Sequence, residues 1–176
     1  MTFLEARNVI VSELEKHIGC PVILSDQIAD VPEYPYCYYS VLTPRTTDHS
    51  FGLNEVRNEK VGYTLLRSEP VSATMSFTFC SMNRETEDGY IFGEDEAMTL
   101  ADKAHGFFLL DAHNIHTANG DIVINNVGAA VSCTSFLVED SLRRYGFDIK
   151  FSYIRTDEKV TTTILKPGNP VGFIYQ

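Results

Sequence analysis

The segment VSATMSFTFCSM, Val71–Met82, carries the strongest structural signal in this chain. Apolar and polar residues alternate along it, with Val71, Ala73, Met75, Phe77 and Phe79 separated by Ser72, Thr74, Ser76, Thr78 and Cys80. Successive side chains of a β-strand point to opposite faces of the sheet. The pattern therefore predicts a strand with one face on the core and a Ser/Thr face turned outward.

Further strands and two helices are expected on either side of this segment. Runs rich in aromatic and β-branched residues predict strands, and Gly, Pro, Asn and Asp mark their connections. We expect a polar loop at 83–93, a connection at 113–120 and a turn at 157–159. The expected helices are 3–18 and 94–112, and the other expected strands are 21–25, 36–43, 61–68, 121–135, 145–155 and 160–165. The strand at 145–155 alternates again, with Tyr145, Phe147, Ile149, Phe151 and Tyr153 on one side and Asp148, Lys150 and Ser152 on the other.

Local signals place the helices. Thr2 and Glu5 have capping-box spacing, in which each side chain bonds to the other residue's backbone N–H. Gly19 suits the left-handed position after a helix, and Pro21 forbids continuation. The second helix begins with acids that suit its dipole, and its inner face holds Ala97, Leu100, Ala101, Ala104, Phe107 and Phe108.

The order of elements is a helix, several strands, a helix and several strands. Most connections are too short for the crossovers that parallel strands need. We therefore expect one α+β domain over residues 1–176, with a mostly antiparallel β-sheet and two α-helices packed on one face.

Two segments stand apart from this plan. Residues 44–60, PRTTDHSFGLNEVRNEK, are polar without a period, and predict either a long loop or the tip of an extended hairpin. Loops of this length are usually functional or disordered. The tail KPGNPVGFIYQ, 166–176, ends in apolar side chains that water solvates poorly, so we expect an arm that docks elsewhere.

Composition argues against several classes of function. The formal net charge of −10 disfavours a sequence-tolerant grip on DNA, which needs clustered Lys and Arg. No apolar run approaches the ~20 residues that span a bilayer, and the acidic N-terminal pattern is unlike a signal peptide. The cysteines lack C-x-x-C spacing, and we expect Cys37 and Cys80 to be buried free thiols.

Motifs for catalysis are missing from the sequence. It contains no nucleophile elbow, P-loop or dinucleotide-binding fingerprint. Asp111, His113 and His116 are metal-capable, but their spacing favours a solvated loop after a helix. The tyrosines between 34 and 39 suit either an aromatic core face or an interface, and both interpretations stay open. No catalytic, metal-binding or cofactor-binding residue is assigned.

Four segments, in order, resemble the tail-terminator (neck-terminator, tail-completion) proteins of tailed bacteriophages. The first two are GCPVILSDQIADVPEYPYCYYSVL at 19–42 and the strand SATMSFTFCS at 72–81. They are followed by the alanine-rich DEAMTLADKAHGFF at 95–108 and by RRYGFDIKFSY at 143–153. Together these segments extend over most of residues 1–155.

The resemblance implies a structural virion protein without catalytic residues or cofactor. Such subunits form a ring, usually hexameric, that caps the tail tube and joins it to the head-side connector or stopper, while DNA passes through the lumen without specific binding. The implied place is the virion tail or neck, assembled in the host cytoplasm with no membrane involved. Alternatives are another connector, stopper or minor tail protein, or a cellular ligand-binding domain or enzyme.

Assembly contacts are then expected at the tyrosine-rich entry to the strand at 36–43, at 44–60 and in the tail. The residues assigned to this interface are Tyr34, Tyr36, Arg45, Phe51, Leu53, Arg57, Phe173 and Tyr175.

Overall fold

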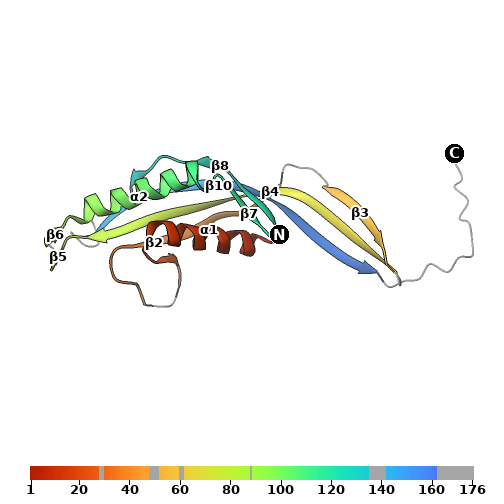
Figure 1. Ribbon diagram of the computed structural model, residues 1–176, viewed down its shortest axis with the longest axis horizontal. Helices are drawn as coiled ribbons and strands as arrows, with labels where there is room; N and C mark the ends of the chain where they lie inside the picture. Colours follow the sequence, from red (N-terminus) through yellow and green to blue (C-terminus); the bar gives the residue numbers. More distant parts are fainter. Residues whose placement is uncertain (28–29, 48–51, 60–61, 88, 135–141, 162–176) are drawn as a thin grey trace, which may run out of the picture.

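Val71–Met82 is part of a longer strand. In the computed structural model, β4 runs over Tyr63–Met82 and pairs antiparallel with β10, Leu142–Thr161, along its whole length (Figure 1). On its other side, β4 pairs with β2, Tyr36–Thr47, and then with β3, Leu53–Asn58. The structure describes residues 1–27, 30–47, 52–59, 62–87, 89–134 and 142–161.

The described strands form one large sheet and a small hairpin. The large sheet has the order β1-β2-β4-β10-β8-β7, with β3 beside β4 and β9 beside β10. Among the described strands only β1 and β2 pair in parallel, which confirms a mostly antiparallel α+β fold. The remaining elements are α1 (Phe3–Ile18), β1 (Val22–Leu24), β5 (Arg84–Thr86), β6 (Gly89–Ile91), α2 (Gly93–Leu110), β7 (Asn114–Thr117), β8 (Gly120–Val127) and β9 (Val131–Ser132).

The ends of α1 are those that the sequence predicts. The Thr2 hydroxyl accepts a hydrogen bond from the Glu5 N–H at 3.3 Å, and a Glu5 carboxylate oxygen accepts one from the Thr2 N–H at 2.6 Å. Gly19 follows the helix with φ 79°, a conformation that costs glycine little because it has no Cβ.

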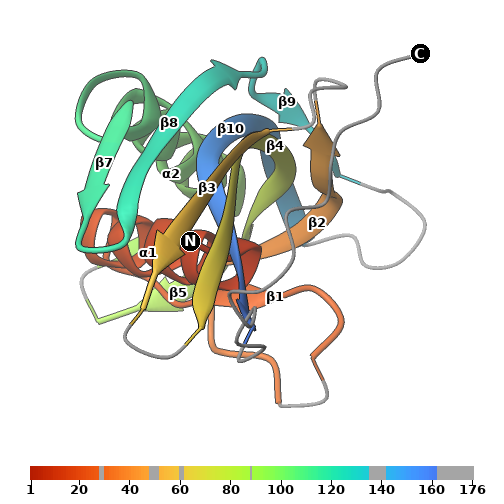
Figure 2. The same ribbon diagram turned by 90° about the vertical axis from the view of Figure 1, so that its right-hand side faces the viewer.

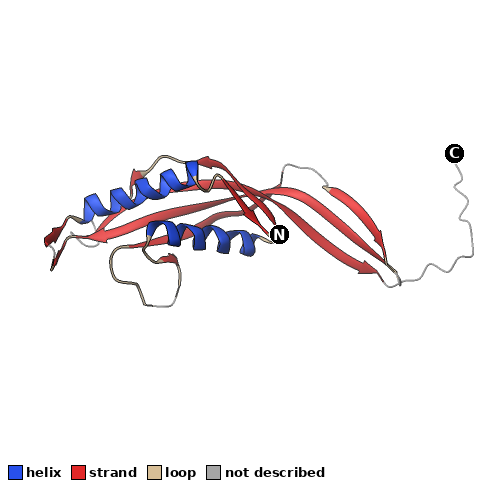
Figure 3. Cartoon of the chain, viewed as in Figure 1, coloured by secondary structure: helices blue, strands red, loops and turns tan. Residues whose placement is uncertain are grey.

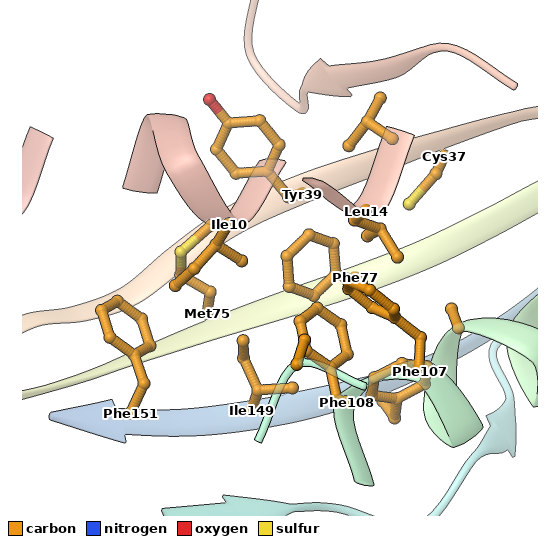
Figure 4. Packing of buried hydrophobic residues seen from close by; sticks show 14 of the residues in the cluster. Ile10, Leu14, Cys37, Tyr39, Met75, Phe77, Phe107, Phe108, Ile149 and Phe151 are labelled. Atoms are coloured by element: carbon orange, nitrogen blue, oxygen red, sulfur yellow. The ribbon is translucent and has the colours of Figure 1, made fainter. Parts of the chain in front are cut away.

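Both helices pack on one face of the sheet, and the main core lies between the helices and the sheet (Figure 4). Phe77 is its centre, with ring centroids 5.6 Å from Phe108 of α2, 6.4 Å from Phe147 of β10 and 6.2 Å from Tyr39 of β2. Burying one such ring stabilises the fold by about 1.5–3 kcal/mol. The predicted inner faces of both long strands are confirmed, and the buried residues are Val71, Ala73, Met75, Phe77, Phe79, Phe147, Ile149, Phe151 and Tyr153.

Close packing at the start of α2 depends on small residues. Ala97, Ala101 and Ala104 are buried residues of this helix. A Cβ on Gly93 would lie 2.5 Å from the Met82 carbonyl carbon, so only glycine lets the helix begin beside the end of β4. Asn83 completes this corner because its side-chain oxygen accepts a hydrogen bond from the Gly93 N–H at 2.9 Å.

The helix-free face of the sheet is polar in its middle and apolar at one end. Ser72, Thr74 and Ser76 are half-buried there, as alternation predicts. Cys80 lies on this face too, and it is the buried free thiol that the sequence predicts, in a second cluster with Tyr36 and Leu142. Cys20 and Cys37 are also buried free thiols, and Cys133 is exposed.

Residues 44–60 are not simply a loop. β2 extends to Thr47, and β3 occupies Leu53–Asn58, so the extended-hairpin interpretation is confirmed for the described residues. The sequence also suggested a loop here because every residue of β3 is exposed. A strand with two solvated faces has no apolar alternation to reveal it.

The predicted break in the last strand is wrong. β10 passes straight through Asp157 and Lys159 to Thr161, so Val160 continues this strand and does not begin a returning one. The ladder with β4 pairs the backbone there, and the Arg155 guanidinium lies 2.8 Å from an Asp157 carboxylate oxygen. Residues 162–165 and the tail lie outside the described residues.

Pro70 explains why one strand looked like two. It lies on β4 opposite Ile154, between the last pair with β2, Thr47–Val71, and the first pair with β3, Leu53–Ser68. Proline lacks the N–H that a ladder needs. Here no ladder bond is lost, because β4 passes at this point from one partner strand to the next.

Two shorter connections also contain strands. The predicted loop at 83–93 holds the hairpin of β5 and β6. The predicted connection at 113–120 holds β7, which turns into β8 between Thr117 and Gly120. Both hairpins are short, and exposed residues dominate them, so their patterns are weak.

Candidate assembly arm

A ribbon of strands projects beyond the helices at one end of the molecule (Figure 1, Figure 3). It consists of residues 53–58 of β3, 63–70 of β4 and 154–161 of β10, and we call these residues the arm. Seen end-on, the three strands lie side by side in front of the helices (Figure 2). The rest of the described chain is called the body.

The arm exposes more apolar surface than its size requires. Leu53, Val56, Ile154 and Val160 have 72%, 57%, 52% and 67% of their surface accessible. Single exposed apolar residues are ordinary, but a group of them on one small element is typical of an interaction surface. The arm is therefore a candidate interaction surface.

Three of these side chains share one face. Cross-strand partners point to the same side of a sheet, and the register places Leu53 opposite Ser68 and Thr156. The same face therefore carries Leu53, Glu55, Arg57, Leu66, Ile154, Thr156, Glu158 and Val160. Leu66, on the central strand, is the one apolar residue among these that is buried, with 5% of its surface exposed.

A buried ion cluster fixes the root of the arm. The Glu69 side chain is 2% exposed, and its two carboxylate oxygens accept hydrogen bonds from the guanidinium groups of Arg45 and Arg67. Arg45 reaches it from the irregular end of β2, where the register with β4 shifts between Thr43 and Thr46. Such a bulge re-aims side chains, so the cluster ties β2 to β4 where the arm begins.

Two further contacts support the same region. The hydrogen bond from Arg155 holds the pKa of Asp157 below its usual range. The N-terminal ammonium of Met1 donates to the Ile154 carbonyl at 3.3 Å, and the Phe3 ring stacks on Phe151 with centroids 6.4 Å apart. The start of α1 therefore packs beside the root of the arm.

The tyrosine-rich stretch lies at the other end of the molecule. Tyr36 is buried against Cys80 and Leu142, and burial raises its pKa. The Tyr34 ring lies 5.3 Å from the Tyr36 ring and lines a shallow groove of about 430 Å³. The other residues of this groove are Val31, Pro32, Glu33, Met82 and Arg84.

The predicted interface residues therefore do not form one site. Leu53 and Arg57 lie on the arm and Arg45 at its root, whereas Tyr34 and Tyr36 lie at the opposite end. The last three, Phe51, Phe173 and Tyr175, lie outside the described residues.

Sequence reasoning missed Glu69, Ile154 and Val160, which belong to the same arm. Ile154 and Val160 carry no signal of an inner face, because they fall on the even-numbered, polar side of the alternation that begins at Tyr145. Nothing in the sequence marks Glu69 as buried, since its partner Arg45 lies 24 residues away.

The described residues hold little that suits catalysis. They contain no group of three or more His, Cys, Asp and Glu side chains placed to bind a metal. His116 lies 2.9 Å from Asp121 on the exposed β7–β8 hairpin, away from His113. None of the described helices is long and apolar enough to cross a membrane.

Comparison with known families adds the decisive observation. A sequence profile described as phage neck terminator protein matches residues 8–174. The chain belongs to this family. The match extends through the body and the arm, and it confirms the resemblance seen in the sequence. A search of curated proteins found no match.

Membership of the neck terminator family settles the coarse function. The protein is a structural component of the phage tail at the neck, and its family implies contacts with other tail or head–tail proteins. The elongated shape, with an exposed strand arm at one end, suits a protein that works through surfaces (Figure 1).

Proposed function

We propose that this neck terminator forms a homo-oligomeric ring, hexameric in the finished particle, that caps the tail tube and joins it to the head-side connector or stopper. Genome DNA passes through the lumen of this ring. The arm, with Leu53, Val56, Ile154 and Val160 exposed, carries the proposal because these residues require cover that the body does not give them.

A ring needs two different patches on each subunit, because each copy contacts its two neighbours through heterologous surfaces. The arm at one end and the Tyr34 groove at the other are separate surfaces of this kind. Arg45, Leu53, Arg57 and Tyr34 are the described residues that we assign to contacts with neighbouring copies, tube protein or connector.

The charge of the chain suits a lumen that does not retain DNA. The formal net charge is −10, and phosphates are repelled by surfaces of the same sign. We assign no enzymatic activity and no cofactor to the protein. The shallow groove at Tyr34 has no His, Lys or nucleophilic Cys or Ser among its lining residues.

The arm's role is tested in a phage that lacks this gene and receives it from a plasmid. The test variant replaces Leu53, Val56 and Val160 by Ser, and the matched control replaces the exposed Leu109 and Leu110 of α2 by Ser. Both variants must melt like the wild type. We expect the arm variant to yield unjoined heads and tails of irregular length, and the control to yield infectious particles.

Normal infectious particles from the arm variant would overturn the role of the arm. Cryo-electron microscopy of wild-type particles tests the rest, because it locates the protein and counts its copies. Finding it away from the end of the tail tube, or in a number other than six, would contradict the corresponding part of the proposal.

A further inference from the structure

The arm has open backbone edges. Beyond Tyr153, where the pairing with β8 stops, no described strand pairs with the outer side of β10. Arg144 and Asp148 accept hydrogen bonds on that side from Cys133 and Gly128, and Ile154 accepts one from Met1. The ladder between β10 and β4 has no register shift, so every even-numbered residue of β10 points its N–H and C=O outward.

The open edge of β10 therefore presents the backbone groups of Thr156, Glu158 and Val160. The hairpin of β3 with β4 shows which backbone groups lie on the open edge of β3. There the Glu59 N–H donates to the Gly62 carbonyl at 3.2 Å, so odd-numbered residues of β3 face β4. The backbone N–H and C=O groups of the even-numbered residues Asn54, Val56 and Asn58 point away from β4, and no described strand pairs with them.

The two open edges are suited to each other. β3 and β10 both run antiparallel to β4, so they point in the same direction along the arm. Rotation about a ring axis roughly parallel to the arm keeps that direction. Neighbouring copies would then bring β10 of one arm beside β3 of the next, in parallel.

We propose that β10 of one copy adds to β3 of the next copy as a parallel strand pair, with Glu158 level with Arg57 of the neighbouring copy. This proposal rests on the ring proposed above and names the contact that builds it. It extends one sheet from arm to arm by strand addition, which unpaired edges favour.

Charge and apolar matching select this register. Within one arm, Glu55 and Glu158 both lie opposite Leu66 of β4. If neighbouring arms stood at the same height, Glu55 of the neighbour would therefore lie beside Glu158. Like charges directly opposite each other destabilise a strand pair. Moving the neighbour's β3 by two residues toward the body replaces this repulsion by the pair of Arg57 with Glu158.

The same two-residue displacement brings Leu53 of the neighbour beside Ile154, so that two exposed apolar side chains cover each other. A displacement of one residue would misalign the backbone donors and acceptors of the two strands and place their matching side chains on opposite faces. Staggered registers of this kind accompany the strand tilt of closed sheets.

The hydrogen bonds of the pair follow from the parallel ladder. Thr156 donates to the carbonyl of the neighbour's Asn54, and the neighbour's Val56 donates to the Thr156 carbonyl. Glu158 then donates to the Val56 carbonyl, and the neighbour's Asn58 donates to the Glu158 carbonyl. All of these groups belong to the two open edges.

Charge reversal in the complemented phage tests the pair. Arg57→Glu alone or Glu158→Arg alone places like charges together, and we expect loss of joined particles. Coexpression of the two single variants restores a complementary contact at every interface of an alternating ring. The double variant restores the same contact between copies in a ring made of one kind of chain. Both should recover joined particles. Glu55→Gln removes only the exposed bond between Glu55 and Arg57 of the same chain and leaves Arg57 and Glu158 in place, so it should behave like the wild type.

Wild-type yields from Glu158→Arg would overturn the proposal, because level arms gain from losing the repulsion with Glu55. A mixture of single variants no better than either alone would also overturn it. Since the mixture contains only the two single variants, its recovery also shows that both of them fold.

Cross-linking in intact particles is a second test of the contact between β10 and the neighbour's β3. Level residues of paired strands lie about 4.8 Å apart, within the Cα range of about 4.4–6.8 Å for disulfides. In a Cys133→Ser background, Arg57→Cys with Glu158→Cys should give a covalent ladder on oxidation, and Glu55→Cys with Glu158→Cys should not. The reverse result, or no ladder from either pair, would refute the contact. The ring itself would still stand if microscopy finds the protein encircling the tube end.

Discussion

Replacing Glu69 by Gln probes the physical basis of the arm's attachment. Gln keeps the size of the side chain but removes the charge that faces Arg45 and Arg67. The Glu69 side chain is 2% exposed, so water cannot replace what is lost. The amide NH₂ would also face a guanidinium that has no acceptor to offer.

The expected loss is about 2 kcal/mol. Removing one partner of a fully buried ion pair costs roughly 3–5 kcal/mol. Here both arginine side chains are 37% exposed, so water screens the uncompensated charge and lowers this cost. In a chain of this size each 1 kcal/mol shifts the melting temperature by about 2–4 °C, so Glu69→Gln should melt about 4–8 °C lower.

Urea unfolding and thermal melting at neutral pH, followed by circular dichroism, measure this effect. Glu55→Gln is the matched control on the arm, because Glu55 is 56% exposed and its bond to Arg57 lies in water. The control should stay within about 0.5 kcal/mol of the wild type. If Glu69→Gln were equally stable, the buried cluster would not be what fixes the arm.

Two other perturbations address the body. The hydrogen bond from Arg84 holds the pKa of Glu96 below its ordinary value of 4.5, so its stabilisation is present above that pH and is lost as pH falls through the lower folded value. Wild-type unfolding free energy, measured by urea titration at several pH values, should therefore fall more steeply below about pH 4.5 than that of Glu96→Gln, and equal slopes would contradict this. Gly146→Ala should cost about 1–3 kcal/mol because its Cβ would lie 2.6 Å from the Phe77 carbonyl oxygen. Gly106→Ala, on a helix with open space around it, should be neutral or stabilising, and thermal melts that reverse this order would refute the packing argument.

The body was predictable because its elements bury one face. Alternation at Phe77 and Phe79, and again at Phe147 and Ile149, has a period that only a half-buried strand explains. The helix ends were predictable for a different reason. The bonds at Thr2 and Glu5 are local, and so the sequence within one helical turn determines them.

The arm was not predictable in the same way. Its edge strand β3 exposes both faces, so residues such as Asn54 and Glu55 show no apolar period. Pro70 and Asp157 are residues that usually interrupt a strand. Here the pairing of β4 with β10 overrides both, and no local pattern contains that information.

The sequence by itself determined the two helices, the inner faces of the long strands and, through the order of its motifs, the family. These depend on contacts near in the chain or on the burial of one face, which leave a periodic trace. Only the tertiary structure decided that residues far apart, 53–58 and 154–161, form a single arm with two open edges. That outcome depends on which strands lie beside β4, and the pairing of distant backbones leaves no periodic trace when both faces meet water.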